Sequence, residues 1–183
     1  MTGSNHYGEQ LARMRLAFDR DFESVRASAV EETEPYVVVR VGGERVALRV
    51  AALSSIEVGA RVMPVPLDLP VLMGLAGVRS VLVPVYRLAT LIGVATSGET
   101  QQVIAVCRAP SPVGLALDGL VGQVEAPRSA RQPAGPAARK HVAELLQTED
   151  GFQPIVDVSS VILELERLAS GRRAASGSNQ RED

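Results

Sequence analysis

Two carboxylates are the side chains whose type and position suggest acid–base chemistry. Asp118 and Asp157 each directly follow an apolar run, and a pair of carboxylates in different environments can serve as acid and base. Asp118, however, belongs to the turn dipeptide Asp118-Gly119, and nothing around either residue indicates a cleft that would shift a pKa. We therefore expect both carboxylates to be structural.

The chain contains few residues that could act as catalytic nucleophiles or metal ligands. The chain has only two histidines, His6 in a polar start and His141 beside Lys140, and we expect both at the surface instead of in a catalytic relay. The single Cys107 alternates with Ala105 in an apolar run, which predicts a buried small hydrophobe. CxxC and HExxH spacings are absent, as are the glycine-rich phosphate loops. The sequence thus predicts no catalytic residues, no metal and no cofactor.

The composition and charge of the chain exclude further functional classes. The 183 residues carry 19 Lys and Arg against 21 Asp and Glu, with 3% aromatic residues. An interspersed, nearly balanced charge with few aromatic rings argues against nucleic-acid binding. No apolar run approaches the length of a membrane span, and the polar start does not resemble a signal peptide. One cysteine allows no internal disulfide. We expect a cytoplasmic interaction module without membrane insertion.

The elements that position these side chains begin with an N-terminal extension, residues 1–34. Its apolar residues recur every three or four positions, which predicts one amphipathic helix with two of the three Phe residues on its apolar face. The stripe either packs on its own domain or mediates association through Phe18 and Phe22. The apolar residues of the stripe are Leu11, Met14, Phe18, Phe22 and Val25.

From Tyr36 the pattern changes to short β-branched runs. YVVVRV and RVALRV flank Gly42-Gly43 and predict a β-hairpin. Many short strands separated by turn residues indicate an all-β barrel or sandwich. The further predicted strands are Val62–Pro66, Val81–Tyr86, Val103–Cys107, Val113–Leu117, Leu120–Val124 and Phe152–Val156.

Prolines, glycines and helix-capping residues predict where the remaining strands, helices and loops begin and end. Pro84 inside VLVPVY predicts an edge strand or a bulge, and Asp68 followed by Pro70 and Gly74 predicts a one-turn helix. The stretch between Pro127 and Pro136 is typical of a flexible loop. A short closing helix is predicted from Ser159 or Ser160 to Leu168, followed by a disordered tail at 169–183.

The segment PVPLDLPVLMGLAGVRSVLVPVYRLATLIG resembles the signature region of the CheW-like family. Val37–Val50 is similar to the opening hairpin of that family, Leu53 and Ile56 fit the strand that follows, and residues 113–125 resemble its hydrophobic-Gly-hydrophobic-Asp segment. The resemblance covers about residues 35–168. The signature positions that match are Gly74, Val78, Arg79, Val83, Pro84, Val85 and Leu88.

Four positions depart from the family pattern. The Asn, Gly and Asp of the signature are Gly77, Ser80 and Arg87 here, and Ser55 stands where Glu is usual. A left-handed backbone at Ser80 would cost about 1–2 kcal/mol, so we expect this turn to have changed shape. Arg87 reverses a local charge. The chain therefore resembles a divergent member of the family.

The resemblance implies a mainly β fold of two five-stranded SH3-like barrels sharing an aliphatic seam, and a non-enzymatic adaptor role. It implies coupling of chemoreceptor cytoplasmic tips to the regulatory domain of a CheA-type histidine kinase, within receptor arrays at the membrane or the nucleoid. The expected kinase-binding residues are Leu53, Ile56 and Val58, and the expected receptor-binding residues are Arg79 and Arg87.

Two other interpretations stay open. The first is a self-assembling array component that uses the N-terminal helix and binds receptor or itself but not the kinase. The second is an unrelated small-ligand or enzymatic β-barrel, which requires an enclosed polar pocket.

Overall fold

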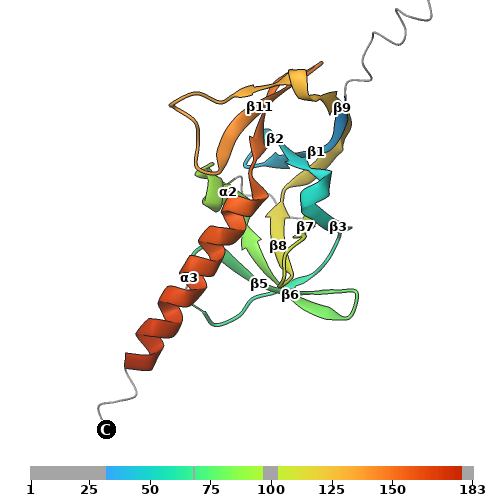
Figure 1. The fold of residues 1–183 in the computed structure, drawn as a ribbon. Helices are drawn as coiled ribbons and strands as arrows, with labels where there is room; N and C mark the ends of the chain where they lie inside the picture. Colours follow the sequence, from blue (N-terminus) through green and yellow to red (C-terminus); the bar gives the residue numbers. More distant parts are fainter. Residues whose placement is uncertain (1–31, 68, 97–102, 179–183) are drawn as a thin grey trace, which may run out of the picture. The chain divides into compact units, whose positions relative to one another are not determined.

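A computed structural model describes residues 32–67, 69–96 and 103–178. The predicted N-terminal helix, with Phe18 and Phe22, lies outside these residues. Two β-sheets make up most of the described chain (Figure 1). No helix among the described residues is both long and apolar enough to cross a membrane.

The first sheet is built from the two ends of the domain. The opening hairpin turns at Gly42 and Gly43, which both have positive φ. Val41 and Glu44 pair with each other on either side of this turn. Strands from the C-terminal half then complete the sheet. Its strands in spatial order are β10 (Arg131–Pro133), β11 (Val142–Thr148), β12 (Gly151–Val156), β2 (Glu44–Arg49), β1 (Thr33–Val41) and β9 (Gly119–Pro127).

The second sheet uses the middle of the chain, so the two sheets are intertwined in sequence. A short 3-10 turn, η1 (Val50–Ala52), leads into it, and helix α2 (Leu88–Ile92) follows its strand β6. Its strands in spatial order are β3 (Leu53–Val58), β7 (Val103–Cys107), β8 (Val113–Leu117), β6 (Val81–Arg87), β5 (Leu72–Val78) and β4 (Val62–Met63).

Three apolar clusters stabilise this arrangement. The largest joins both sheets to α2 and to the C-terminal helix α3 (Val158–Ser178), with Leu48, Leu88, Leu115 and Val161 at its centre. It is the aliphatic seam expected between two barrels. Two smaller clusters fill the individual sheets, and the one in the second sheet includes Val83, Val85, Ile104 and Val106. Burial of each large side chain contributes about 1.5–3 kcal/mol.

The predicted fold class is confirmed, with more strands than expected. Within the described residues each sheet has six strands instead of five. Strands β7 and β8 match their predicted bounds at both ends. The additional strands β10 and β11 come from a region for which the sequence predicts a flexible loop or no regular element.

Two predictions around β5 and η2 (Arg128–Ala130) are wrong. The segment predicted as a one-turn helix ending at Gly74 instead enters β5, because Leu72 pairs with Tyr86 and Gly74 with Val85. The segment after Pro127 forms η2 and then β10, which pairs with β11. In both places cross-strand pairing overrides the local turn signals.

Pro84 lies in a strand that has neighbours on both sides, so β6 is not an edge strand. β6 pairs with β5 along its length but with β8 only from Val85 to Arg87. Pro84 therefore sits just before the parallel ladder begins, where its missing N–H breaks no bond. The first half of β6 has one side open.

Helix α3 differs from the prediction at both ends. Its N-cap is Asp157, whose Oδ1 accepts hydrogen bonds from the backbone N–H of Ser159 at 3.0 Å and of Ser160 at 3.2 Å. The helix continues through Gly171 to Ser178 and so includes part of the segment predicted to be disordered. Alanine and arginine in this extension have good helix propensity, whereas its glycines and serines do not.

Candidate partner-binding surface

The two candidate carboxylates have structural partners and do not form a pair. Asp118 Oδ2 accepts a hydrogen bond of 2.5 Å from the Gly42 N–H, at the turn of the opening hairpin. Asp157 caps α3, as described above. Cys107 is buried, as predicted, and burial raises the pKa of its thiol to about 12. A thiol with this pKa is a poor nucleophile at neutral pH.

His141 is not the surface residue that the sequence predicts. Its side chain is only 5% exposed, and its backbone has a positive φ of 60°. Nδ1 lies 2.7 Å from Ser160 Oγ and Nε2 lies 2.6 Å from Glu164 Oε2. These distances match a serine–histidine–carboxylate relay. However, Asp157 occupies the backbone N–H groups of Ser159 and Ser160, which would otherwise be natural donors to an oxyanion. The cluster instead ties the segment before β11 to the first turns of α3.

The Glu164 carboxylate should give this tie a characteristic pH dependence. The hydrogen bond from Lys140, and secondarily that from His141, lowers the Glu164 pKa from its usual 4.5. Because the folded-state pKa is lowered, the stabilisation is complete above about pH 4.5 and is lost as pH falls through the folded value. We expect Glu164→Gln to lower the free energy of unfolding by about 1 kcal/mol at neutral pH.

This difference between Glu164→Gln and the unmodified chain should shrink as pH falls toward about pH 3. Urea unfolding of both proteins across this range measures it. A difference that is constant with pH would show that the carboxylate charge is not its source.

A second group of ionisable side chains gathers on the first sheet and is balanced internally. Glu34 and Glu144 face Arg49 and Arg131, with Arg49 Nε 3.3 Å from Glu34 Oε1 and Arg131 NH1 3.8 Å from Glu144 Oε1. The Tyr36 hydroxyl donates to Glu34 at 2.7 Å. With two charges of each sign in mutual contact, this network is structural.

The three residues predicted to bind a kinase lie along one strand, β3, but differ in exposure. Leu53 is buried in the shared core, and Ile56 is partly buried against the same core. Both therefore face the core of their own domain. Val58, at the end of the strand, is 70% exposed. Of the three side chains, only that of Val58 is fully available to a partner.

Two further apolar side chains are exposed near the tip of the β5–β6 hairpin of the second sheet. Val81 and Leu82, the first residues of β6, are 51% and 61% exposed. The Glu57 carboxylate next to Val58 lies 4.0 Å from Arg79 Nε at the tip of the β5–β6 hairpin. Figure 1 shows this hairpin reaching beyond the neighbouring strands. We call Val58, Arg79, Val81 and Leu82 the hairpin patch.

Sequence reasoning missed Val81 and Leu82 because they open the continuous apolar run VLVPVY, which is typical of a buried strand. It also missed the role of Ser55. The Ser55 hydroxyl donates to Glu57 Oε1 at 2.7 Å, and residues two apart on a strand share a face. An acid is thus retained two residues along the strand from the position where the family resemblance places one.

The hairpin tip keeps a left-handed backbone, contrary to the expected change of turn shape. Arg79 and Ser80 have φ values of 46° and 67°, and Val78 pairs with Val81 across them. Two central residues with positive φ define a type I′ turn, which favours Asn-Gly. Side chains at both positions store about 1–2 kcal/mol of strain each. The turn holds Arg79, 75% exposed, at the edge of the patch.

Ser80→Gly should relieve part of this strain. We expect the free energy of unfolding to rise by about 0.5–1 kcal/mol, because the lost strain exceeds the entropy cost of glycine. Thermal unfolding should show a midpoint higher by about 1–3 °C. Ser159→Gly, at an exposed position in the first turn of α3 whose φ is not positive, is the control and should not raise the midpoint. A lower midpoint for Ser80→Gly would contradict the strain assignment.

Arg87 lies at the other end of the same strand. Seven residues at about 3.3 Å each separate it from the hairpin tip by roughly 20 Å. Its backbone N–H donates to Val71 O at 2.8 Å, and its buried Nε has no hydrogen-bond partner among the described residues. The structure therefore does not bring the two predicted receptor-binding arginines together.

Together these features define a class of protein: a double β-sheet domain whose candidate catalytic groups have structural partners and whose distinctive surface is an exposed apolar patch. Residues 35–166 match the family model of the CheW-like domain. The chain therefore belongs to the CheW-like family, whose proteins are scaffolds and adaptors of chemotaxis signal transduction.

Solved structures agree with this assignment at the level of the fold. The crystal structure of the scaffolding protein TtCheW from Thermoanaerobacter tengcongensis is similar with a TM-score of 0.63 and 17% sequence identity. The similarity covers 69% of this chain and 90% of that one. No curated protein gave a significant match.

Proposed function

We propose that this protein is a non-enzymatic adaptor that couples chemoreceptors to a CheA-type histidine kinase. The hairpin patch is the observation that carries the proposal. Its apolar side chains would be covered by the regulatory domain of the kinase, and Arg79 at its edge would meet carboxylates or carbonyls of the receptor tip. A planar guanidinium suits such directional contacts.

Burial energies support a partner at this surface. Covering Val58, Val81 and Leu82 would stabilise a complex by about 1.5–3 kcal/mol for each side chain that becomes fully buried, less where it is already half covered. Exposed apolar groups gathered at one end of a folded domain are typical of protein-binding sites. In this proposal receptor and kinase meet the adaptor at adjacent positions, and the more distant Arg87 adds a second receptor contact.

Arg79→Ala tests the receptor contact. We expect binding to receptor cytoplasmic fragments to weaken about tenfold, because a charge-assisted hydrogen bond is lost, while kinase binding and thermal stability change little. Titration of the full chain against each partner separately measures this. Arg167→Ala, an exposed arginine on α3, is the control and should bind as the unmodified chain does.

Unchanged receptor binding by Arg79→Ala would reject the role of Arg79. If the full chain binds receptor fragments or itself but no kinase domain, the self-assembling alternative replaces the coupling function. Loss of folding in Arg79→Ala would instead show that this arginine is structural.

A further inference from the structure

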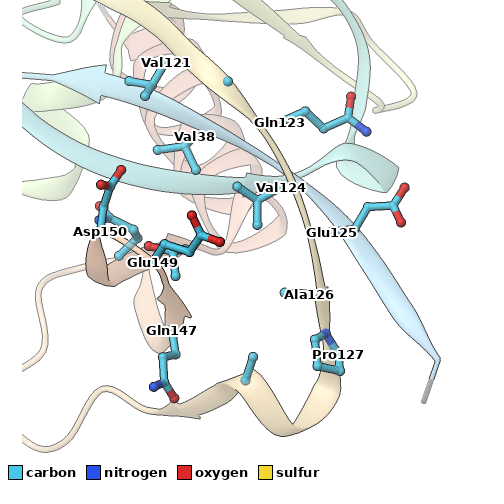
Figure 2. Close-up of a pocket in the computed structure, with 14 residues that line it drawn as sticks. Val38, Val121, Gln123, Val124, Glu125, Ala126, Pro127, Gln147, Glu149 and Asp150 are labelled. Atoms are coloured by element: carbon cyan, nitrogen blue, oxygen red, sulfur yellow. The ribbon is translucent and has the colours of Figure 1, made fainter. Parts of the chain in front are cut away.

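The first sheet contains a cavity that the adaptor function does not use. It has a volume of about 640 Å³ and lies between β1, β9 and the turn that joins β11 to β12. The apolar cluster inside this sheet is small and includes two alanines, Ala47 and Ala126. Figure 2 shows Val38, Val121 and Val124 facing this space. We call it the barrel pocket.

A buried amide lies on the wall of the barrel pocket. Gln153 on β12 is only 6% exposed, and its side chain has no hydrogen-bond partner among the described residues. Its amide atoms are not among the fully buried polar atoms that lack a partner, so the amide lies at the surface of the pocket that it lines. The Gln153 amide therefore has both a donor and an acceptor to offer to whatever enters the pocket.

A carboxylate stands at the mouth of the pocket. Figure 2 shows the Glu149 side chain directed toward Val38 and Val124. The neighbouring Asp150 is paired with Arg45 at 2.5 Å, whereas Glu149 has no ion pair within the described part of the chain. The negative charge of Glu149 is therefore available to pair with a cationic group of a ligand. An apolar wall, one polar group inside and one charge at the entrance are typical of a specific binding site.

The strand beside the pocket adds a backbone element to this site. β9 is the last strand of the first sheet and pairs only with β1 among the described strands. Its outer edge therefore presents unpaired backbone groups, and Leu120 and Val121 on it are nearly half exposed. A free edge of this kind accepts an extended peptide as an additional strand.

We infer that the barrel pocket binds the basic side chain of an extended segment of a partner protein that lies along the edge of β9. The aliphatic stem of a lysine or arginine packs on Val38, Val121 and Val124, as long basic side chains commonly do on apolar surface. Its charged head donates to the Gln153 carbonyl group and to the Glu149 carboxylate. This site is separate from the hairpin patch, so its test is independent of receptor and kinase coupling.

A short blocked peptide of alternating valine and threonine with one central arginine is a suitable probe. Calorimetric titration of the full chain should show saturable binding, and a peptide with glutamine in place of arginine should bind at least tenfold more weakly. Glu149→Gln and Gln153→Leu should each weaken binding of the arginine peptide about tenfold. Glu166→Gln removes an exposed acid on α3 instead and should leave binding unchanged.

Three results would overturn the inference. The first is equal binding by Glu149→Gln, Gln153→Leu and the unmodified chain. The second is equal affinity for free arginine amide and for the peptide, which would identify a small organic cation as the ligand without strand addition. The third is equal binding of the arginine and glutamine peptides. If Gln153→Leu does not fold, Glu149→Lys provides the same test at the mouth of the pocket and should abolish binding.

Discussion

Replacing Leu82 by glutamate is expected to weaken binding of the CheA-type kinase regulatory domain by about a hundredfold. In the proposed complex the exposed surface of Leu82 becomes buried, and this burial contributes about 1–2 kcal/mol to the free energy of binding. A carboxylate in the same place adds a desolvation cost without a compensating partner. A sum near 3 kcal/mol corresponds to about two orders of magnitude in Kd.

Folding should be nearly unaffected, because Leu82 is 61% exposed and lies opposite Gly77 on β5. Leu163→Glu is a matched control, since Leu163 on α3 is 56% exposed and lies outside the hairpin patch. Titration of both variants against the surface-immobilised kinase domain measures the effect. We expect Leu163→Glu to bind this domain as the unmodified chain does. Equal loss in both variants would indicate a general effect of charge, and no loss in either would remove the hairpin patch from the kinase interface.

How far the sequence predicts this structure depends on the range of the interactions involved. Strands β7 and β8 are continuous β-branched runs closed by turn residues, and their bounds follow directly from the pattern. The opening hairpin follows from Gly42-Gly43 in the same way. In contrast, β5 carries a helix-like start and two glycines, and becomes a strand only because β6 lies beside it.

The candidate sites show the same limit. His141 meets partners 19 and 23 residues away in sequence, a separation at which no local pattern marks a contact. Leu53 and Val58 lie on one strand, and the sequence cannot tell which end is covered by the shared core. The resemblance predicts Arg79 as a binding residue, and the 75% exposure of its side chain supports that hypothesis.

The first half of β6, which has no neighbouring strand on one side, relates the proline signal in the sequence to the exposed residues of the hairpin patch. Pro84 marks where pairing with β8 stops, and the residues before it, Val81 and Leu82, are the ones left exposed. A proline within an apolar run thus indicates that part of the strand extends past its neighbour. The local rule that predicts an edge strand from Pro84 holds for half of the strand, and that half carries the hairpin patch.

Gly74→Ala is expected to destabilise the domain severely, by about 4 kcal/mol or more. Gly74 has a φ of 149°, and a Cβ atom at this position would lie 2.0 Å from the Met63 carbonyl oxygen and 2.7 Å from its carbon. Both atoms are backbone, so β4 would have to move away from β5. Native domains are stable by only about 5–15 kcal/mol, and such a loss leaves a large unfolded fraction at physiological temperature.

Gly77→Ala on the same strand is the matched control. Its φ lies outside the left-handed region, and a Cβ atom at Gly77 would have no neighbouring atom within 4 Å, so alanine should be neutral or raise the free energy of unfolding by about 0.4–1 kcal/mol. Urea unfolding of both variants distinguishes the two glycines. Similar midpoints would mean that the approach of β4 to Gly74 is not required by the fold. A large loss for Gly74→Ala alone would show that only glycine at this position allows β4 to pack onto the base of the hairpin that carries the hairpin patch.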